Sequence, residues 1–360
     1  MMQEKELIKK QIVKKIKAAG DILITSHIMP DGDNIGSVCA LTGALRFCGY
    51  KVDCALFDAV PEILLFLPGS AEIKRLSDID KKYDLLIVLD SSSVERTGVQ
   101  DLSKYSNFVI NIDHHVCNDN FGNINLVHTN YSSTTQIVFE LIKKARLKLN
   151  QDIATCLYCG LMTDTVGFQT SNTDENVFKM AAALVKFGAS PNYISREMFQ
   201  NKSMKNIIMI GKTLSALNFI DNGLICWGKV DQKTIKEVGA LPTDCFGIVN
   251  QMVSIKGVEV AILFNERADG KTVIDFRSKS FIDVNKIANA FGGGGHLRAS
   301  GATNEGELND IIAAVVNFAV EHIKNNYQSC FMKGTNAVEP HCSGQQKGPK
   351  TNTVVKSVGI

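Results

Sequence analysis

Short, unbroken apolar runs alternate with stretches of helical period along the first half of the chain. The apolar runs lie within residues 21–27, 51–57, 83–90 and 107–115. Apolar residues recur at helical spacing within residues 37–49, 134–145 and 151–164. Continuous apolar strands separated by helices are typical of a parallel sheet that is buried on both faces. We therefore expect an α/β first domain whose parallel sheet carries helices on both faces.

The second half of the chain predicts a smaller α/β domain. Three further β-rich runs lie within residues 223–230, 258–266 and 271–278, and a more polar helical pattern precedes them. After Cys330 the sequence has no hydrophobic period and many turn-forming residues, which predicts a disordered tail. The expected organisation is a first domain at residues 1–192, a helical connector at 193–220, a second domain at 221–328 and the tail at 329–360.

The composition and net charge of the chain argue against some classes of binding partner. With 360 residues, of which 45% are hydrophobic, the chain can bury two cores. Its net charge of +2 lacks the strong positive bias of proteins that grip long nucleic acids, so a small or short anionic ligand fits better. No run approaches the roughly 18 unbroken apolar residues of a membrane span. The ten cysteines show no disulfide framework, which favours a cytoplasmic protein.

Four clusters of polar side chains stand where predicted strands or helices end. They are His27, Asp31 and Asp33; Asp90; Asp113, His114 and His115; and Asp164. Taken singly, an aspartate at such a place is usually a helix cap or a turn former. The carboxyl ends of parallel strands meet at one edge of a sheet, however, so we expect the four clusters to converge there.

A convergence of this kind predicts a metal site. Crowded carboxylates repel one another, and bound divalent cations would remove that repulsion. Mixed imidazole and carboxylate ligands favour Mn²⁺, because Mg²⁺ prefers oxygen ligands and structural Zn²⁺ usually recruits cysteine. Two such ions can share a carboxylate, acidify a bridging water and stabilise the attacking and leaving oxygens at phosphorus. We therefore predict two Mn²⁺ ions, with Mg²⁺ or Co²⁺ as possible substitutes.

The ordered motifs "SHIMPDGDNIGS", "LDSSSVERTG", "NIDHHVCN" and "TDT" resemble those of the DHH phosphoesterase superfamily. The resemblance implies that a first metal is held by His27, Asp31 and Asp90. It implies that a second metal is held by Asp33, Asp90, His114 and Asp164, with Asp90 as the bridge. By the same resemblance, His115 would face the substrate phosphate as electrophile or acid, and Asp113 would fix the orientation of a histidine.

The run "FGGGGHLRASG" offers two interpretations from its residues alone. One glycine is enough to end a helix, whereas four allow backbone N–H groups to approach an anion beside His296 and Arg298. Together with "DFRSKS" the run resembles the DHHA1 domain. The resemblance implies that Arg277, Ser278, Gly294, Gly295 and His296 hold a terminal phosphate or nucleotide away from the metals, which would lie in the cleft between the domains. Arg96 matches a family arginine, which implies a structural or phosphate-facing role; the alternative is a solvated charge on a loop.

These resemblances imply a Mn²⁺-dependent phosphoesterase for short substrates. We expect hydrolysis of short oligoribonucleotides to mononucleotides, removal of the 3′-phosphate of 3′-phosphoadenosine 5′-phosphate (pAp), or both. Hydrolysis of linear or cyclic dinucleotides (pApA, cyclic di-AMP) is the alternative, followed by a pyrophosphatase or a non-catalytic nucleotide-binding protein. We expect no binding of long nucleic acids or membranes, and the sequence leaves a homodimer open.

The chain departs from the family pattern at three positions. Val166 stands where glycine is expected, Gln169 stands where many relatives carry arginine, and Leu297 stands where a basic residue is common. None of the three is a predicted metal ligand.

Overall fold

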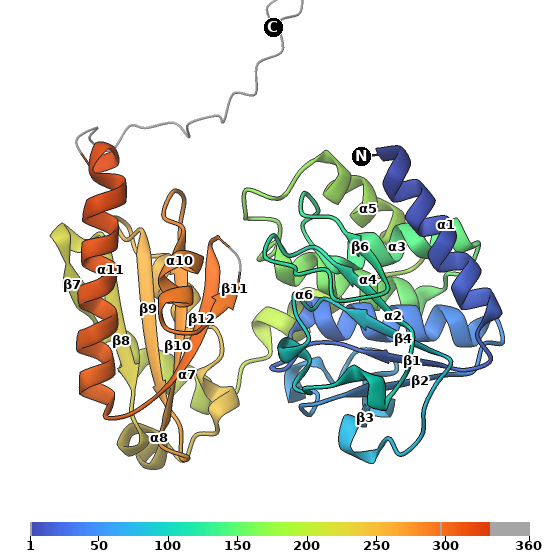
Figure 1. The fold of residues 1–360 in the computed structure, drawn as a ribbon. Coiled ribbons are helices and arrows are strands. Elements are labelled where there is room, and N and C mark those ends of the chain that lie inside the picture. Colours follow the sequence, from blue (N-terminus) through green and yellow to red (C-terminus); the bar gives the residue numbers. More distant parts are fainter. Residues whose placement is uncertain (1, 296, 332–360) are drawn as a thin grey trace, which may run out of the picture.

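The protein is described by a computed structural model that covers residues 2–295 and 297–331 (Figure 1). His296 and residues 332–360, which make up most of the predicted tail, lie outside the described residues. Within the described part, none of the helices is long and apolar enough to cross a membrane. The chain forms two α/β domains, each built on its own six-stranded sheet.

The first sheet is entirely parallel, as predicted. Its order is β3-β2-β1-β4-β5-β6. The strands are β1 (Ile22–Thr25), β2 (Val52–Leu56), β3 (Lys74–Arg75), β4 (Leu85–Leu89), β5 (Val109–Asp113) and β6 (Ile124–Val127). The four predicted strands are the buried central ones. Strands β3 and β6 were missed because β3 has two exposed residues and β6 is only half-buried, so neither shows an unbroken apolar run.

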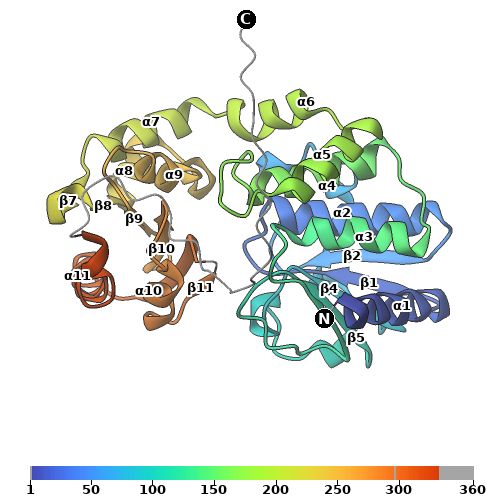
Figure 2. The ribbon, with the colours of Figure 1, turned by 90° about the horizontal axis from the view of Figure 1, so that it is seen from above.

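The α-helices cover one face of this sheet, and shorter 3₁₀ helices pack on the other face around Leu76 and Leu102 (Figure 2), whereas Leu64 of a further 3₁₀ helix belongs to the main core. The α-helices are α1 (Met2–Ala18), α2 (Gly32–Phe47), α3 (Thr134–Ala145), α4 (Gln151–Asp164) and α5 (Glu175–Lys186). The 3₁₀ helices are η1 (Glu62–Leu64), η2 (Ser70–Glu72), η3 (Leu76–Asp78), η4 (Glu95–Thr97) and η5 (Leu102–Lys104). The main core lies between the sheet and the α-helices. On the opposite face, Leu76 of η3 and Leu102 of η5 pack with Leu86 and Val88 of β4.

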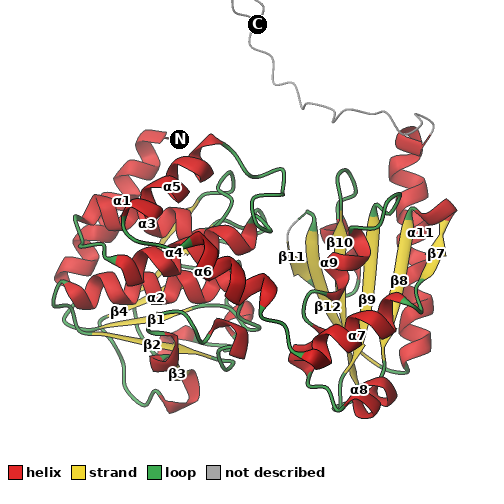
Figure 3. Cartoon of the chain, turned by 180° about the vertical axis from the view of Figure 1, so that it is seen from behind, coloured by secondary structure: helices red, strands yellow, loops and turns green. Residues whose placement is uncertain are grey.

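A helical segment joins the two domains, as Figure 3 shows from behind. It consists of α6 (Pro191–Ser195), the π-helix η6 (Arg196–Gln200) and α7 (Met204–Leu214). The segment continues into β7 (Asn218–Ile220), the first strand of the second domain. Residues 193–220, predicted as a helical connector, are therefore helical over most of their length.

The second sheet is mostly antiparallel, in the order β11-β12-β10-β9-β8-β7, with β8 and β9 as its parallel pair. After β7 its strands are β8 (Ile225–Val230), β9 (Val260–Glu266), β10 (Lys271–Ser278), β11 (Gly294–Gly295) and β12 (Ala299–Glu305). Its helices are η7 (Asp221–Gly223), α8 (Gln232–Val238), η8 (Pro242–Cys245), α9 (Ile248–Val253), α10 (Val284–Ala290) and α11 (Leu308–Phe331). Helices α10 and α11 cover one face, and α7 and α9 cover the other.

The glycine run combines a helix end with a tight strand pair. Gly292 follows α10 with a φ of 70°, which suits a helix stop. A Cβ atom on Gly293 would lie 2.1 Å from the carbonyl oxygen of Gly301, and one on Gly295 would lie 2.6 Å from that of Ala299. Glycine is therefore required here because β12 runs so close to β11. Strand β11 lies on the side of the second domain that faces the first domain (Figures 1 and 2).

The strand order places a switch point between β1 and β4. From β1 the chain adds β2 and β3 on one side, and from β4 it adds β5 and β6 on the other. In open parallel sheets, ligands bind beyond the carboxyl ends of the strands at such a point. His27 follows β1 and Asp90 follows β4, so the fold brings the first two predicted clusters to this place.

Candidate metal centre

The segment after β1 carries His27, Asp31 and Asp33 in a sharp turn into α2. Asp31 is the N-cap of α2, and its carboxylate accepts the N–H groups of Asp33 (3.1 Å) and Asn34 (3.0 Å). His27 and Asp33 are buried, whereas Asp31 is exposed. The helix start thus fixes the spacing between an imidazole, a buried carboxylate and an exposed one.

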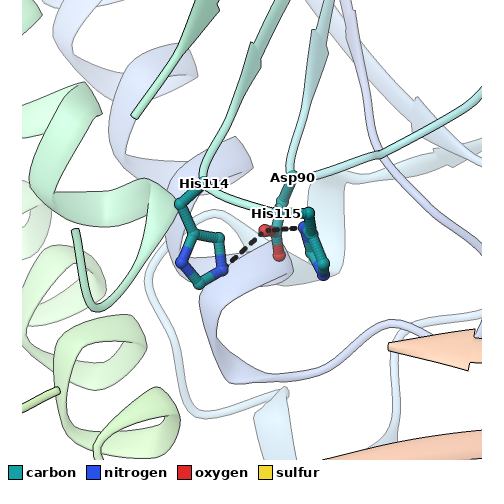
Figure 4. A group of neighbouring side chains, drawn as sticks. All are labelled: Asp90, His114 and His115. Atoms are coloured by element: carbon teal, nitrogen blue, oxygen red, sulfur yellow. Dashed lines mark ion pairs between the residues drawn. The ribbon is translucent and has the colours of Figure 1, made fainter. Parts of the chain in front are cut away.

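Asp90 is the centre of the cluster. Its carboxylate lies 3.4 Å from Nε2 of His27 and 3.6 Å from Nε2 of His114. Figure 4 shows that His114 and His115 approach Asp90 from different sides. The backbone of Asp90 has a φ of 55°, which is uncommon for a residue other than glycine and is often associated with functional sites. The hydroxyl of Thr134 donates to the Asp90 carboxylate at 2.9 Å.

Asp164 and Asp33 complete the side of the cluster near His114. Asp164 ends α4, and its carboxylate lies 3.2 Å from Nε2 of His114. Asp33 accepts the backbone N–H groups of Thr134 (2.6 Å) and Thr135 (2.9 Å) at the start of α3. The positive end of that helix dipole therefore faces a buried carboxylate.

Three groups of side chains in the described residues could each hold a metal ion, with ligand atoms that all lie within 4.8 Å of one another. One group, His27 with Asp31 and Asp90, is the predicted first set. A second, Asp33 with His114 and Asp164, is the predicted second set without the shared Asp90. The third joins Asp90 to His114 and His115. The structure thus brings all six predicted ligands together, and their role as ligands stays a prediction.

The orientation of the two buried histidines fits metal binding. Nδ1 of His27 lies 2.7 Å from the carbonyl oxygen of Ile28, and Nδ1 of His114 lies 3.1 Å from that of Tyr131. A carbonyl oxygen can only accept, so each Nδ1 carries the proton. In the neutral imidazole this leaves the lone pair on Nε2, on the side of the carboxylates, where it can bind a cation, as is usual for a metal-bound imidazole.

The electrostatics of the cluster also favour cations. Burial, with Asp90 and Asp164 close by, raises the pKa of Asp33 well above its ordinary value. Burial raises the pKa of Asp164 to about 6, although His114 opposes the shift. Burial disfavours the charged form of His114, but the hydrogen bond to Asp164 outweighs it and raises the pKa of His114. In the absence of metal, protons must supply the positive charge that the buried carboxylates require.

His115 is held by Asp113 at the edge of the cluster. Nδ1 of His115 lies 2.7 Å from the buried Asp113 carboxylate and 3.8 Å from Asp90. Burial by itself would raise the pKa of Asp113, but the charge of His115 and the hydrogen bonds to the carboxylate together have the opposite and larger effect, so the pKa of Asp113 is lowered. The same carboxylate accepts the N–H of His114 (2.8 Å) and the side-chain amide of Asn118 (2.6 Å). Asp113 therefore holds the loop that carries both histidines, and the role that the family resemblance gives it stays a prediction.

Sequence reasoning missed the residues that orient the cluster. These are Asn118, Tyr131, Thr134 and Thr135. Asn118 was visible as the last residue of "NIDHHVCN". The other three were hidden, because the start of α3 comes into contact with Asp33 only through the tertiary fold.

The predicted substrate contacts are divided between the two domains. Arg96 lies close enough to His27 for its charge to oppose protonation of that imidazole. Arg277 of β10 lies in the second domain, where burial lowers its pKa, although the charges of Asp275 in the same strand and of Asp31 in the first domain oppose the shift. The Arg277 guanidinium donates to the side chain of Asn250 (3.1 Å) and to the carbonyl oxygen of Phe276 (2.9 Å).

Ser278 and Arg298 hold the loop after β10. The Ser278 hydroxyl (2.6 Å) and the Arg298 guanidinium (2.7 Å) both donate to the carbonyl oxygen of Ile282. Gly294 and Gly295 form β11. His296, the remaining predicted contact, lies outside the described residues. The substrate-binding role of all these residues stays a prediction.

Comparison with known proteins agrees with this architecture. Residues 21–161 match the model of the DHH family, N-terminal domain, and residues 231–321 match that of the DHHA1 domain. The chain is 31% identical over 304 residues to the Bifunctional oligoribonuclease and PAP phosphatase NrnA of Thermus thermophilus, covering 84% of this chain and 89% of that protein. It is 27% identical to the protein of the same name from Bacillus subtilis, covering 88% of this chain and 100% of the relative.

A solved structure extends the likeness to both domains. The exopolyphosphatase-related protein from Bacteroides fragilis superimposes with a TM-score of 0.80 at 27% identity, covering 89% of this chain and 97% of that one. The fold, the cluster and the relatives agree. The chain therefore belongs to the DHH/DHHA1 family of metal-dependent phosphoesterases.

Proposed function

We propose that this protein is a Mn²⁺-dependent phosphoesterase that hydrolyses short oligoribonucleotides to mononucleotides and removes the 3′-phosphate of pAp. The observation that carries the proposal is that the imidazoles of two histidines, each held by a backbone carbonyl oxygen, face the same buried carboxylate. Nε2 of His27 and Nε2 of His114 approach Asp90 from two sides, at 3.4 and 3.6 Å. A carboxylate shared in this way suits two neighbouring cations. The names of the Thermus and Bacillus relatives support the substrate class.

The donor set fits Mn²⁺. Its ligand atoms are imidazole nitrogens and carboxylate oxygens, and no cysteine belongs to any of the three groups found in the described residues. His27, Asp31 and Asp90 would hold one ion, and Asp33, Asp90, His114 and Asp164 the other. When bound, the ions would lower the pKa of a water molecule and neutralise charge on the phosphate.

His115 and Asp113 would act on the substrate. Asp113 holds Nδ1 of His115, which leaves Nε2 to donate a hydrogen bond to a phosphate oxygen or a proton to the leaving oxygen. Asp113 also stabilises the protonated imidazole, because its carboxylate remains charged in the buried site. The pair would therefore orient the phosphate and stabilise the charge that develops on it.

The second domain would hold the far end of the substrate. Arg277 of β10 pairs in register with Ala299 of β12, the strand that also pairs with β11, and the charges of Asp275 and Asp31 both act on its guanidinium. Ser278 and Arg298 would keep the 279–283 loop in place beside it. Such an arrangement suits substrates of a few nucleotides, whose terminal phosphate is bound by one domain while the scissile phosphate is at the other. We also expect a cytoplasmic location.

The test is a substrate panel. Purified protein is incubated with pAp, pApA, a five-nucleotide RNA, cyclic di-AMP and pyrophosphate, each with Mn²⁺, Mg²⁺, Co²⁺ or EDTA, and products are separated by chromatography. We expect Mn²⁺-dependent loss of the RNA and pAp, with little loss of cyclic di-AMP and pyrophosphate.

Other outcomes assign the site differently. Loss of only pApA or cyclic di-AMP would replace the proposal by a dinucleotide phosphodiesterase with the same metal chemistry. Loss of pyrophosphate alone would make the enzyme a pyrophosphatase. Binding of nucleotides with no turnover under any metal would contradict a catalytic function.

A further inference from the structure

The turn after α4 has an unusual backbone. Val166, Gly167 and Phe168 have φ values of 48°, 71° and 68°, three consecutive residues in the left-handed region. The N–H of Gly167 donates to the carbonyl oxygen of Met162 at 2.7 Å, which places Val166 at the position that glycine usually takes in this helix ending. A β-branched residue is strained there, because its Cβ comes too close to a neighbouring carbonyl oxygen.

Neighbouring contacts explain why the strained turn persists. The Thr165 hydroxyl is buried, donates to the carbonyl oxygen of Leu161 (2.7 Å) and accepts the N–H of Phe168 (3.1 Å). The ring of Phe168 packs against Tyr158 at 6.0 Å and stacks on Phe178 at 5.6 Å. The packing of the Phe168 ring therefore offsets the strain of its left-handed backbone.

Val166 gains no comparable packing. Its side chain is 41% exposed, and it is absent from the core clusters of the described residues, in contrast to Phe168. Glycine at this position would allow the same turn without strain. Because strained residues cluster at functional sites, an exposed valine in this conformation points to a use for its side chain.

The position of Val166 suggests what that use is. Asp164, two residues earlier, lies 3.2 Å from His114 in the metal cluster. Two residues span at most about 7 Å between Cα atoms, so Val166 stands at the rim of the cluster. An exposed branched apolar side chain beside a polar centre suits the apolar face of a base or the carbons of a ribose.

We propose that Val166 is a specificity-determining residue that contacts the nucleoside attached to the scissile phosphate. The inference rests on the proposed function, since it assumes a nucleotide at the metal cluster. Val166 contributes apolar contact to binding and takes no part in the chemical step.

Three variants distinguish the effect of the Val166 side chain on substrate binding from the effect of its strained backbone. Val166→Gly removes the side chain and the strain, Val166→Ala removes most of the side chain, and Val166→Ile keeps both. We expect kcat/KM for a short RNA with Mn²⁺ to fall roughly tenfold in the glycine and alanine variants, mainly through KM, and to stay near the wild-type value in the isoleucine variant. We expect the thermal midpoint to rise, by about 2 °C, only in the glycine variant.

Binding of AMP provides a readout that does not depend on turnover. Isothermal titration in Mn²⁺ should show a roughly tenfold weaker Kd in Val166→Gly than in the wild type. Equal Kd and equal kcat/KM in the wild type and in the glycine and alanine variants would overturn the proposal.

The two proposals can fail separately. If the wild type hydrolyses no nucleotide, the proposed function is wrong, and the AMP titration still decides the role of Val166. A weaker Kd in Val166→Gly would support the contact in that case. An unchanged Kd, or no AMP binding by the wild type, would refute it.

Discussion

Asp90 is the residue on which the two predicted metal sets depend. Its carboxylate is buried, faces the Nε2 atoms of His27 and His114, and accepts a hydrogen bond from Thr134. The hydrogen bond with His27 lowers its pKa despite burial, so the group stays charged. The charged carboxylate of Asp90 thus lies next to both predicted sets of metal ligands.

Replacing Asp90 by asparagine should remove the shared ligand with almost no change in volume. We expect Mn²⁺ bound per chain, measured by mass spectrometry of the desalted protein, to fall from two to one or none, and turnover to fall by at least 10³-fold. The rise in thermal midpoint that saturating Mn²⁺ gives the wild type should shrink as well.

The exposed Asp78 of η3 offers a matched control, since Asp78→Asn makes the same change outside the cluster. It should leave Mn²⁺ content and turnover at wild-type values. Two ions retained in Asp90→Asn would show that Asp90 is not the bridge.

At the scale of elements, the close pairing of α2 and α4 places the acidic residues. Asp31 and Asp33 lie at the start of α2, and Asp164 lies at the end of α4. A Cβ atom on Gly36 of α2 would lie 2.5 Å from the carbonyl oxygen of Cys156, and one on Gly160 of α4 would lie 2.7 Å from a carboxylate oxygen of Asp33. The two helices therefore approach at a distance that only glycine permits.

The α2 helix contains its own control for this packing. Gly36→Ala should force the helices apart, which we expect to cost about 1–3 kcal/mol of unfolding free energy and to weaken Mn²⁺ binding. In Gly43→Ala, about two turns further along the same face of α2, the added Cβ meets the side chain of Ile153 at 3.4 Å, an ordinary van der Waals distance. This substitution should be neutral or stabilising by up to about 1 kcal/mol, because alanine is the better helix former.

Urea unfolding in EDTA and Mn²⁺ titration would measure both effects. Equal stability of the Gly36→Ala and Gly43→Ala variants would contradict the role given to the α2–α4 contact. A loss of stability in Gly36→Ala without any loss of Mn²⁺ affinity would show that the contact supports the fold but not the site.

For the whole molecule, we expect Arg277 of the second domain to add a positive charge to that of Arg96 at the acidic cluster of the first domain. Arg277 is placed by Asn250 and by the backbone of its own strand, and it lies near enough to Asp31 for their charges to interact. A substrate phosphate would compete for this guanidinium. This arrangement predicts that substitutions in the first domain affect metal binding, whereas the substitution of Arg277 in the second domain affects substrate binding alone.

Arg277→Ala should therefore raise KM for a short RNA by roughly 10- to 100-fold while Mn²⁺ content stays unchanged. The exposed Arg267, in the turn between β9 and β10, provides the control, since Arg267→Ala removes the same charge from the same domain. We expect no change in KM for that variant. Loss of bound Mn²⁺ in Arg277→Ala, or an equal effect of both variants, would refute this prediction.

Some of this molecule could be predicted from the sequence because the signals were local. Strands β1, β2, β4 and β5 are almost fully buried and show as runs rich in apolar residues, with Asp53 in β2 and Asn111 and Asp113 in β5 as the polar exceptions, and helices α2, α3 and α4 show their period. Strands β3 and β11 have two residues each, and β7 and β12 lie half-exposed at or near the sheet edge, so no apolar pattern marked them.

The sequence by itself determined which side chains could bind metal and which strands carry them, since a strand's end and the polar residues after it are neighbours in the chain. Only the tertiary structure decided that β1 and β4 lie side by side, and that the start of α3 donates to Asp33. It also decided that Val166 keeps a left-handed backbone next to Asp164. These features depend on contacts between segments far apart in sequence or on the balance of strain and packing, which no local pattern encodes.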